Sequence, residues 1–270
     1  MTLRPATDFH SHLAPGVDDG AAEIADSRAA AAALVRDGVT TAIVTPHFDG
    51  SLTLAPAMAA ERLAVLDEGF DALLSDAEVA ASGLRILRGV ELMLDVPDPD
   101  VSDARLRLNG GRFVLVEYPG LQLPLGHADF AIRFLRTQGW QPVLAHAERY
   151  RNVDDSLEQL LTLRFAGAYF QVNAGSLVGY HGEAAKRRVH ALLGRGWAEY
   201  GSSDFHARGT PAVSAARAVL ADEGASEQAE LLFCENPERL VRGEAPLAVA
   251  PMGTATRAKR SWWDRLFGAR

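Results

Sequence analysis

Five of the eight histidines in this 270-residue sequence follow short apolar runs that predict β-strands, and carboxylates follow most of the other runs. Imidazole and carboxylate groups together suit manganese, zinc or iron better than calcium or magnesium. A single histidine at a strand end is more often a loop anchor, but ligand types after nearly every strand indicate a metal site. The candidate ligands are His10, His12, Asp19, His47, Glu91, Glu117, His146, Asp204 and His206.

These candidates exceed what one ion can use, so the sequence predicts a cluster of two or three divalent ions. Manganese is the expected ion, with zinc or iron as alternatives, and Glu91 or Asp204 could bridge two of them. Such a cluster lowers the pKa of a bound water and clamps the attacking and leaving oxygens of a phosphate ester. Phosphoester hydrolysis is therefore the predicted chemistry.

The elements that position these residues alternate between strand and helix, which predicts a parallel sheet. Glycines 38, 139 and 196 mark helix ends. Seven strand units are enough to close into a β/α barrel, and an open doubly wound sheet is the alternative. We expect strands ending near Phe9, Thr45, Glu91, Glu117, Ala145, Val172 and Ser202, and helices over 22–37, 56–76, 128–138, 157–164 and 183–195.

The composition is that of a globular protein, with 48% hydrophobic and 23% charged residues. A net charge of −8 argues against nucleic-acid binding. No early stretch reads as a signal peptide or membrane span, so a cytoplasmic location is expected. The single cysteine, Cys234, excludes an internal disulfide. Because only four residues, two of them glutamates, separate it from Arg239, it does not fit the phosphate loop of a thiol phosphatase.

The amino-acid composition changes after Gly243. We expect a barrel over 1–243, an Ala/Pro-rich linker over 244–256 and a basic, aromatic tail over 257–270. A helical tail would place Trp262, Trp263, Leu266 and Phe267 on one face, with arginines around it. It would lie on the inner face of an anionic membrane or dock on a kinase; a disordered end or a helix packed on the barrel are the alternatives.

Three motifs resemble those of the polymerase and histidinol phosphatase (PHP) superfamily: His10-Ser11-His12, Thr45-Pro46-His47 and Asp204-Phe205-His206. The sequence is most similar to the bacterial PHP-type tyrosine phosphatases of capsule and exopolysaccharide operons. That similarity rests on further motifs in matching order: Val17-Asp18-Asp19-Gly20, Gly89-Val90-Glu91, Val116-Glu117, Ala145-His146-Ala147-Glu148-Arg149-Tyr150 and Gln171-Val172-Asn173.

The resemblance implies a distorted (β/α)7 TIM-like barrel and removal of phosphate from tyrosines of a partner bacterial tyrosine kinase. It implies metal ligation by the nine candidates above. Arg149 matches an arginine that steadies the phosphoryl group, and Arg208 is the candidate for a second, although it lies closer to His206 than the family pattern has it. Two alternatives stay open: a small-molecule phosphatase of the histidinol phosphatase type, and a non-catalytic metal-binding regulator of the kinase.

Overall fold

The computed structural model describes residues 4–124 and 126–253 and shows an α/β fold built on parallel strands. One sheet has the order β1-β2-β4 and the other has the order β3-β5-β6-β7-β8-β9, and every pair of neighbours is parallel. The predicted alternation of strands and helices is confirmed. The strands are β1 (Ala6–Ser11), β2 (Val39–Val44), β3 (His47–Asp49), β4 (Arg85–Arg88), β5 (Glu91–Met93), β6 (Phe113–Glu117), β7 (Gln141–Leu144), β8 (Tyr169–Asn173) and β9 (Tyr200–Ser202).

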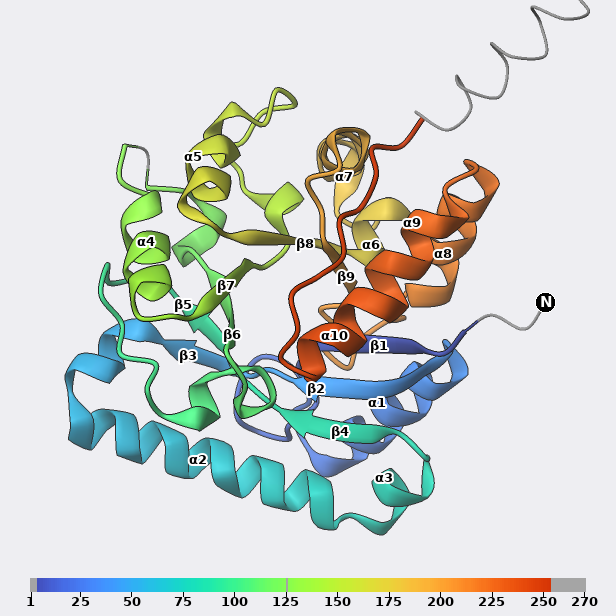
Figure 1. The fold of residues 1–270 in the computed structure, drawn as a ribbon. Helices are drawn as coiled ribbons and strands as arrows, with labels where there is room; N and C mark the ends of the chain where they lie inside the picture. The colour runs from blue at the N-terminus through green and yellow to red at the C-terminus, as the bar shows by residue number, and fades with distance from the viewer. Residues whose placement is uncertain (1–3, 125, 254–270) are drawn as a thin grey trace, which may run out of the picture.

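The helices lie around the outside of the strands (Figure 1). All five predicted helices are present, and each of the three predicted glycines follows its helix with a positive φ. Three further helices follow Gly196, beyond the predicted segments, and a π-helical turn over Leu231–Glu235 joins the last two of them. The helices are α1 (Ile24–Arg36), α2 (Pro56–Ser75), α3 (Ala77–Ala81), α4 (Asp129–Thr137), α5 (Glu158–Ala166), α6 (Ala174–Leu177), α7 (Gly182–Arg195), α8 (Val213–Asp222), α9 (Ser226–Glu230) and α10 (Asn236–Val241).

The two sheets are joined because β2 leads into β3 and β4 leads into β5 across short breaks. Pro46 lies in the first break and has no N–H to donate, but its carbonyl accepts from Glu91 N at 3.1 Å. Gly89 lies in the second break and donates to the carbonyl of Val44 at 3.0 Å. A Cβ at position 89 would lie 3.0 Å from Leu108, so the tight packing here favours glycine.

The segment after β9 returns to the end of β1. Asp204 N donates to His10 O at 2.8 Å, and His12 N donates to Phe205 O at 2.9 Å. A small apolar core contains side chains from strands of both sheets, so the strands face a common interior. The rings of Phe9 and Tyr200 meet edge to face there, with their centroids 5.3 Å apart. A larger core lies between the strands and the surrounding helices.

Residues 244–253, the described part of the expected linker, form no helix or strand and run along the body. Asn236 exchanges two hydrogen bonds with the main chain of Leu247, and Met252 N donates to Leu193 O at 3.0 Å. The rest of the linker and the predicted tail over 257–270 lie outside the described residues. Within the described ranges, no helix has the length and apolar character needed to span a membrane.

Candidate metal centre

The nine predicted ligands gather at the carboxyl-terminal ends of the strands, the edge where α/β folds build their sites. Each comes from the end of a strand or from the loop or short break that follows it, so the parallel arrangement brings distant residues together. They are His10 and His12 at the end of β1, Asp19 in the next loop, His47 at the start of β3, Glu91 at the start of β5, Glu117 at the end of β6, His146 after β7, and Asp204 and His206 after β9.

The first group of side chains consists of His10, His12, Glu91 and Asp204, and it is the most buried. His10 Nε2 lies 3.2 Å from an oxygen of Glu91 and 3.2 Å from Asp204 Oδ1. His12 Nε2 lies 3.3 Å from His10 Nε2 and 3.4 Å from Asp204 Oδ1. Ligands about 2.0–2.2 Å from a common ion would be roughly 3.0–3.5 Å apart, so this spacing fits one divalent cation.

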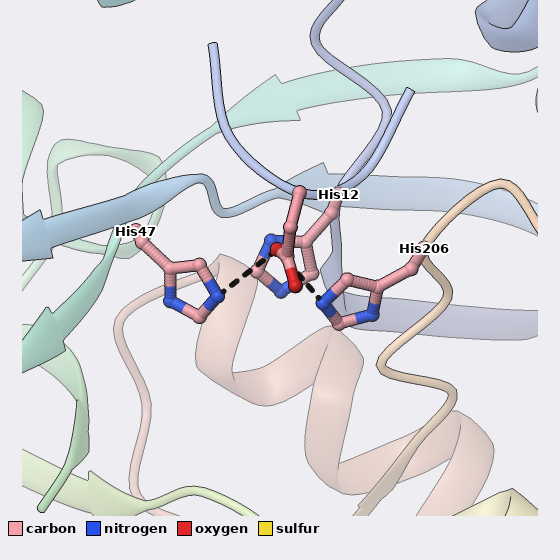
Figure 2. A group of neighbouring side chains, drawn as sticks. His12, His47 and His206 are labelled. Atoms are coloured by element: carbon pink, nitrogen blue, oxygen red, sulfur yellow. Dashed lines mark ion pairs between the residues drawn. The ribbon is translucent and has the colours of Figure 1, made fainter. Parts of the chain in front are cut away.

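The second group places Asp19 between two histidines near the mouth of the cavity. Asp19 Oδ1 lies 3.3 Å from His47 Nε2 and 3.3 Å from His206 Nε2. His12 belongs to the same cluster, and its ring stacks on His206 with centroids 4.0 Å apart. Figure 2 shows the rings of His12, His47 and His206 converging.

The third group consists of His47, Glu91 and Glu117, with His146 beside it. His47 Nδ1 lies 3.2 Å from Glu91 Oε2 and 3.3 Å from Glu117 Oε1, and His146 Nε2 lies 2.9 Å from Glu91 Oε1. Glu91 thus faces the first group with one oxygen and His146 with the other. Its Oε2 lies near His47 as well as the first group, so Glu91 is placed between the first and third groups.

Three buried polar atoms in this cluster test whether the residues suit a metal. Asp204 Oδ1, His47 Nδ1 and His146 Nδ1 have no hydrogen-bond partner among the described residues. Buried polar atoms are nearly always paired, so orphans on ligand-type side chains indicate room for a missing partner. Two of the three atoms face the carboxylates and imidazoles above. The donor set and its orphaned atoms fit a divalent metal.

The imidazoles and carboxylates of the first group hold one another in their charged forms. Burial favours a higher pKa for Glu91, but His10, His12 and His146 hold its pKa well below the usual value. Burial favours a lower pKa for His12, but its hydrogen bond to Asp18 and the nearby carboxylates raise that pKa well above the usual value. Because metal ligation needs neutral imidazoles, metal binding here would release protons.

Two buried polar side chains outside the predicted ligand set, Gln171 and Asn173, orient the candidate ligands. Gln171 Oε1 accepts from the main-chain N–H of His146 at 2.7 Å and lies 3.2 Å from His10 Nδ1. Gln171 also donates to Asn173, which donates to Asp204 Oδ2 at 2.9 Å. The signal available in the sequence was their spacing, because alternate residues of a strand share a face.

The two predicted arginines lie in different places. Arg149 lines the metal cavity and pairs with Asp204 Oδ2 through Nη1 at 2.6 Å. Arg208 lines a neighbouring hollow and donates to the carbonyl of Asp19 at 2.6 Å. Of the three histidines outside the predicted ligand set, His127 and His181 are exposed and His190 is half-buried.

Comparison with known proteins identifies relatives along nearly the whole described chain. Residues 6–242 match the family model described as capsular polysaccharide synthesis, CpsB/CapC. Tyrosine-protein phosphatase YwqE of Bacillus subtilis (strain 168) is 31% identical over 241 residues, covering 88% of this chain and 92% of the relative. Tyrosine-protein phosphatase CpsB of Streptococcus pneumoniae is 27% identical over 243 residues, covering 87% and 97%.

A solved structure also matches most of this chain. It comes from a study of YwqE from Bacillus subtilis and CpsB from Streptococcus pneumoniae, described as unique metal-dependent tyrosine phosphatases. It superposes with a TM-score of 0.73 at 30% identity, covering 91% of this chain and 98% of the other.

Proposed function

The chain belongs to the CpsB/CapC family of capsular polysaccharide synthesis proteins, as the resemblance in its motifs predicted, and from that membership we propose that it is a metal-dependent protein-tyrosine phosphatase. The observation that carries the proposal is the convergence of nine ligand-type side chains, seven of which line one cavity together with Arg149, while His10 and His12 lie buried beside them. The substrate is phosphotyrosine on a bacterial tyrosine kinase of capsule or exopolysaccharide synthesis.

Two or three divalent ions, manganese or alternatively zinc or iron, would be held by the three groups of side chains. The first group takes one ion, and Glu91 is shared with the third group. When bound, such ions activate water and neutralise charge on the phosphoryl oxygens. Three divalent ions would outweigh the four carboxylates of the cluster, so a phosphate dianion would meet a net positive site.

The side chains of this chain supply orientation. Arg149 carries five N–H donors, and its described contact with Asp204 uses one, so the planar guanidinium can also bind phosphoryl oxygens. Asp204 in turn is fixed by Asn173. Arg208, in the wall of the neighbouring hollow, is the candidate for a second contact with the substrate. Together they would hold the phosphorus in line for displacement of the phenolate.

The architecture proposed for this activity is a distorted (β/α)7 barrel. The broken strands β2–β3 and β4–β5 each count as one unit, which makes seven units with β1, β6, β7, β8 and β9. The hydrogen bonds between the β9 exit and β1 support closure. We propose that the barrel covers 1–243, that 244–256 is a linker, and that the 257–270 tail brings a cytoplasmic enzyme to the membrane or its kinase.

The test is turnover of a phosphotyrosine peptide beside a phosphoserine peptide and histidinol phosphate. Metal-stripped protein would be restored with manganese, zinc or iron, and a His10→Ala/His12→Ala variant would be run in parallel. The matched control is His190→Ala, because His190 pairs with Glu223 outside the cluster. The proposal expects phosphotyrosine-selective activity that needs metal, is lost in the double variant and is kept in the control.

Two other outcomes would redirect the assignment. Preference for histidinol phosphate would keep the metal site but make the enzyme a small-molecule phosphatase. Bound metal and tight kinase binding without turnover of any ester would make the protein a non-catalytic regulator of the kinase.

A further inference from the structure

A second hollow opens beside the cavity that the candidate ligands and Arg149 line. The two share Asp204 and His206 as walls, and the second is as large as the first, about 210 Å³ against about 220 Å³. Its outer walls come from the β8–α7 connection and from the loop after β9, and they include Tyr180, His181 and Arg208. A phosphoryl group bound in the first cavity would have the rest of its substrate close to this second one.

A chain of hydrogen bonds fixes His181 in the wall of the second hollow. Ser176 Oγ donates to Glu148 Oε1 at 2.5 Å, and that oxygen also accepts from Asn173 N at 3.0 Å. The hydroxyl proton of Ser176 is therefore committed to Glu148. His181 Nδ1 lies 2.9 Å from the same Ser176 oxygen, so Nδ1 must be the donor. A neutral His181 then presents Nε2 as a hydrogen-bond acceptor.

The same three residue types build nucleophilic triads, but the arrangement here is different. Ser176 stands between the carboxylate and the imidazole, whereas a triad places the histidine in the middle. Ser176 and Glu148 are also completely buried, so no phosphorus can reach the hydroxyl. The chain positions His181 and does not form a covalent intermediate.

Tyr180 stands beside His181 as a braced but exposed aromatic ring. Its main-chain N–H donates to Gly175 O at 2.8 Å, and its hydroxyl lies 3.1 Å from Thr210 Oγ1 across the hollow. The residue is nevertheless 61% exposed. A Cβ at Gly175 would lie 3.1 Å from the His181 ring, so glycine at this position lets Tyr180 and His181 pack close to the main chain of residue 175. A braced ring gives a binding partner large contact area at low entropic cost.

We propose that the second hollow binds the polypeptide next to the phosphorylated tyrosine, with His181 and Tyr180 as specificity-determining residues. His181 Nε2 accepts a main-chain N–H of the peptide, and the Tyr180 ring covers a neighbouring side chain. This inference rests on the proposed protein-tyrosine phosphatase function. It follows from the shared walls of the two hollows, because a peptide extends beyond its phosphotyrosine and a small phosphate ester does not.

The test compares a phosphotyrosyl peptide with para-nitrophenyl phosphate on manganese-loaded full-length protein. In His181→Ala and in Tyr180→Ala, KM for the peptide should rise about tenfold, as for one lost buried contact, with kcat changed less than twofold. KM for para-nitrophenyl phosphate should rise several times less. Tyr180→Phe keeps the ring and should restore peptide KM to within about twofold. The matched control is Phe165→Ala, whose ring is 81% exposed on α5.

Each outcome separates this inference from the function on which it rests. Metal content and Tm like those of the wild type would establish that the variants are folded. Equal KM changes for both substrates, or no change for the peptide, would overturn the inference while leaving the phosphatase assignment standing. A wild-type protein that hydrolyses para-nitrophenyl phosphate but no phosphopeptide would overturn the proposed function, and this inference with it.

Discussion

His12 Nδ1 lies 2.8 Å from Asp18 Oδ2. The imidazole therefore keeps its proton on Nδ1 and turns Nε2 toward His10 and Asp204 in the first group. Asp18 also accepts from the main-chain N–H groups of Gly20 and His47, so one carboxylate ties two loops of the metal centre together. Asp18, which is not among the candidate ligands, thus fixes the tautomer and ring direction of His12 and the surrounding backbone.

Replacing Asp18 with asparagine should weaken metal binding by about 10–100-fold, because the ring of His12 loses its charged acceptor. Calorimetric titration of metal-stripped protein with manganese measures this directly. Asp49→Asn is the matched control, since Asp49 is an exposed carboxylate on β3. An unchanged manganese Kd for Asp18→Asn would mean that His12 is oriented by packing alone.

Glu91→Gln should be more damaging than Glu117→Gln. Glu91 lies within 3.2 Å of nitrogens of His10, His47 and His146, whereas Glu117 lies 3.3 Å from His47 Nδ1 and 3.8 Å from His146 Nε2. Losing a shared ligand removes several kcal/mol of charge stabilisation, so kcat/KM should fall by at least about a thousandfold. Steady-state kinetics with metal analysis checks both variants. Similar losses in the two would contradict the bridging role.

Chelation should destabilise the folded protein. An ion at about 100 times its Kd stabilises by about 2.7 kcal/mol when it binds only the folded state. For a chain of this size, that corresponds to a fall in Tm of roughly 5–10 °C for each ion removed. Thermal unfolding with and without a chelator, followed by addition of manganese, measures the loss and its recovery. An identical Tm would argue against metal binding by the folded chain.

Asp76 should contribute stability that depends on pH. Hydrogen bonds from Arg28 and from the main chain of Val79 lower the pKa of Asp76 to about 2. A carboxylate whose pKa is lower in the folded state stabilises above its unfolded value of 3.8, and loses that contribution as the pH falls toward 2. The Tm difference between wild type and Asp76→Asn should be present at pH 6 and should shrink below pH 4. A constant difference would assign the effect to packing.

Cys234 should be inert in the native protein. The thiol is buried, and burial raises its pKa to about 12, so hardly any thiolate exists near neutral pH. Ellman's reagent at pH 8 should leave it unmodified until guanidinium unfolds the chain, when one thiol per chain should react. Rapid labelling of Cys234 in the native protein would contradict this prediction and would support a reactive thiol.

The sequence was sufficient to bring the nine candidate ligands together, because parallel strands deliver their carboxyl ends to one edge. Their metal-binding roles stay a prediction until metal is measured. The roles of Gln171 and Asp18 could not be predicted in the same way. The spacing of Gln171 and Asn173 indicates that they share one face of a strand, but not that this face meets His10 rather than solvent, and Asp18 lies in a loop without periodicity. Hydrogen-bond partners are set by the packed structure, whereas ligand type and strand position can be read locally.

The helices after Gly196 and the strand breaks at Pro46 and Gly89 were not predicted, for different reasons. The alanine-rich run Val213–Asp222 has an apolar face as marked as that of α1, so its helix could have been predicted from the sequence. A proline after Val44 indicates only the end of a strand. Continuation into β3 depends on the carbonyl of Pro46 finding Glu91 N, which is a long-range contact.

The contacts between His10 and Asp204 also set an order of events during biosynthesis. The first group needs residues from both ends of the folded body, so it cannot assemble until nearly the whole chain has left the ribosome. The third group draws only on residues between His47 and Glu117 and can meet much earlier. An ion in the first group, or in the second group with its His12 and His206, would therefore bind only after the chain beyond His206 has been made.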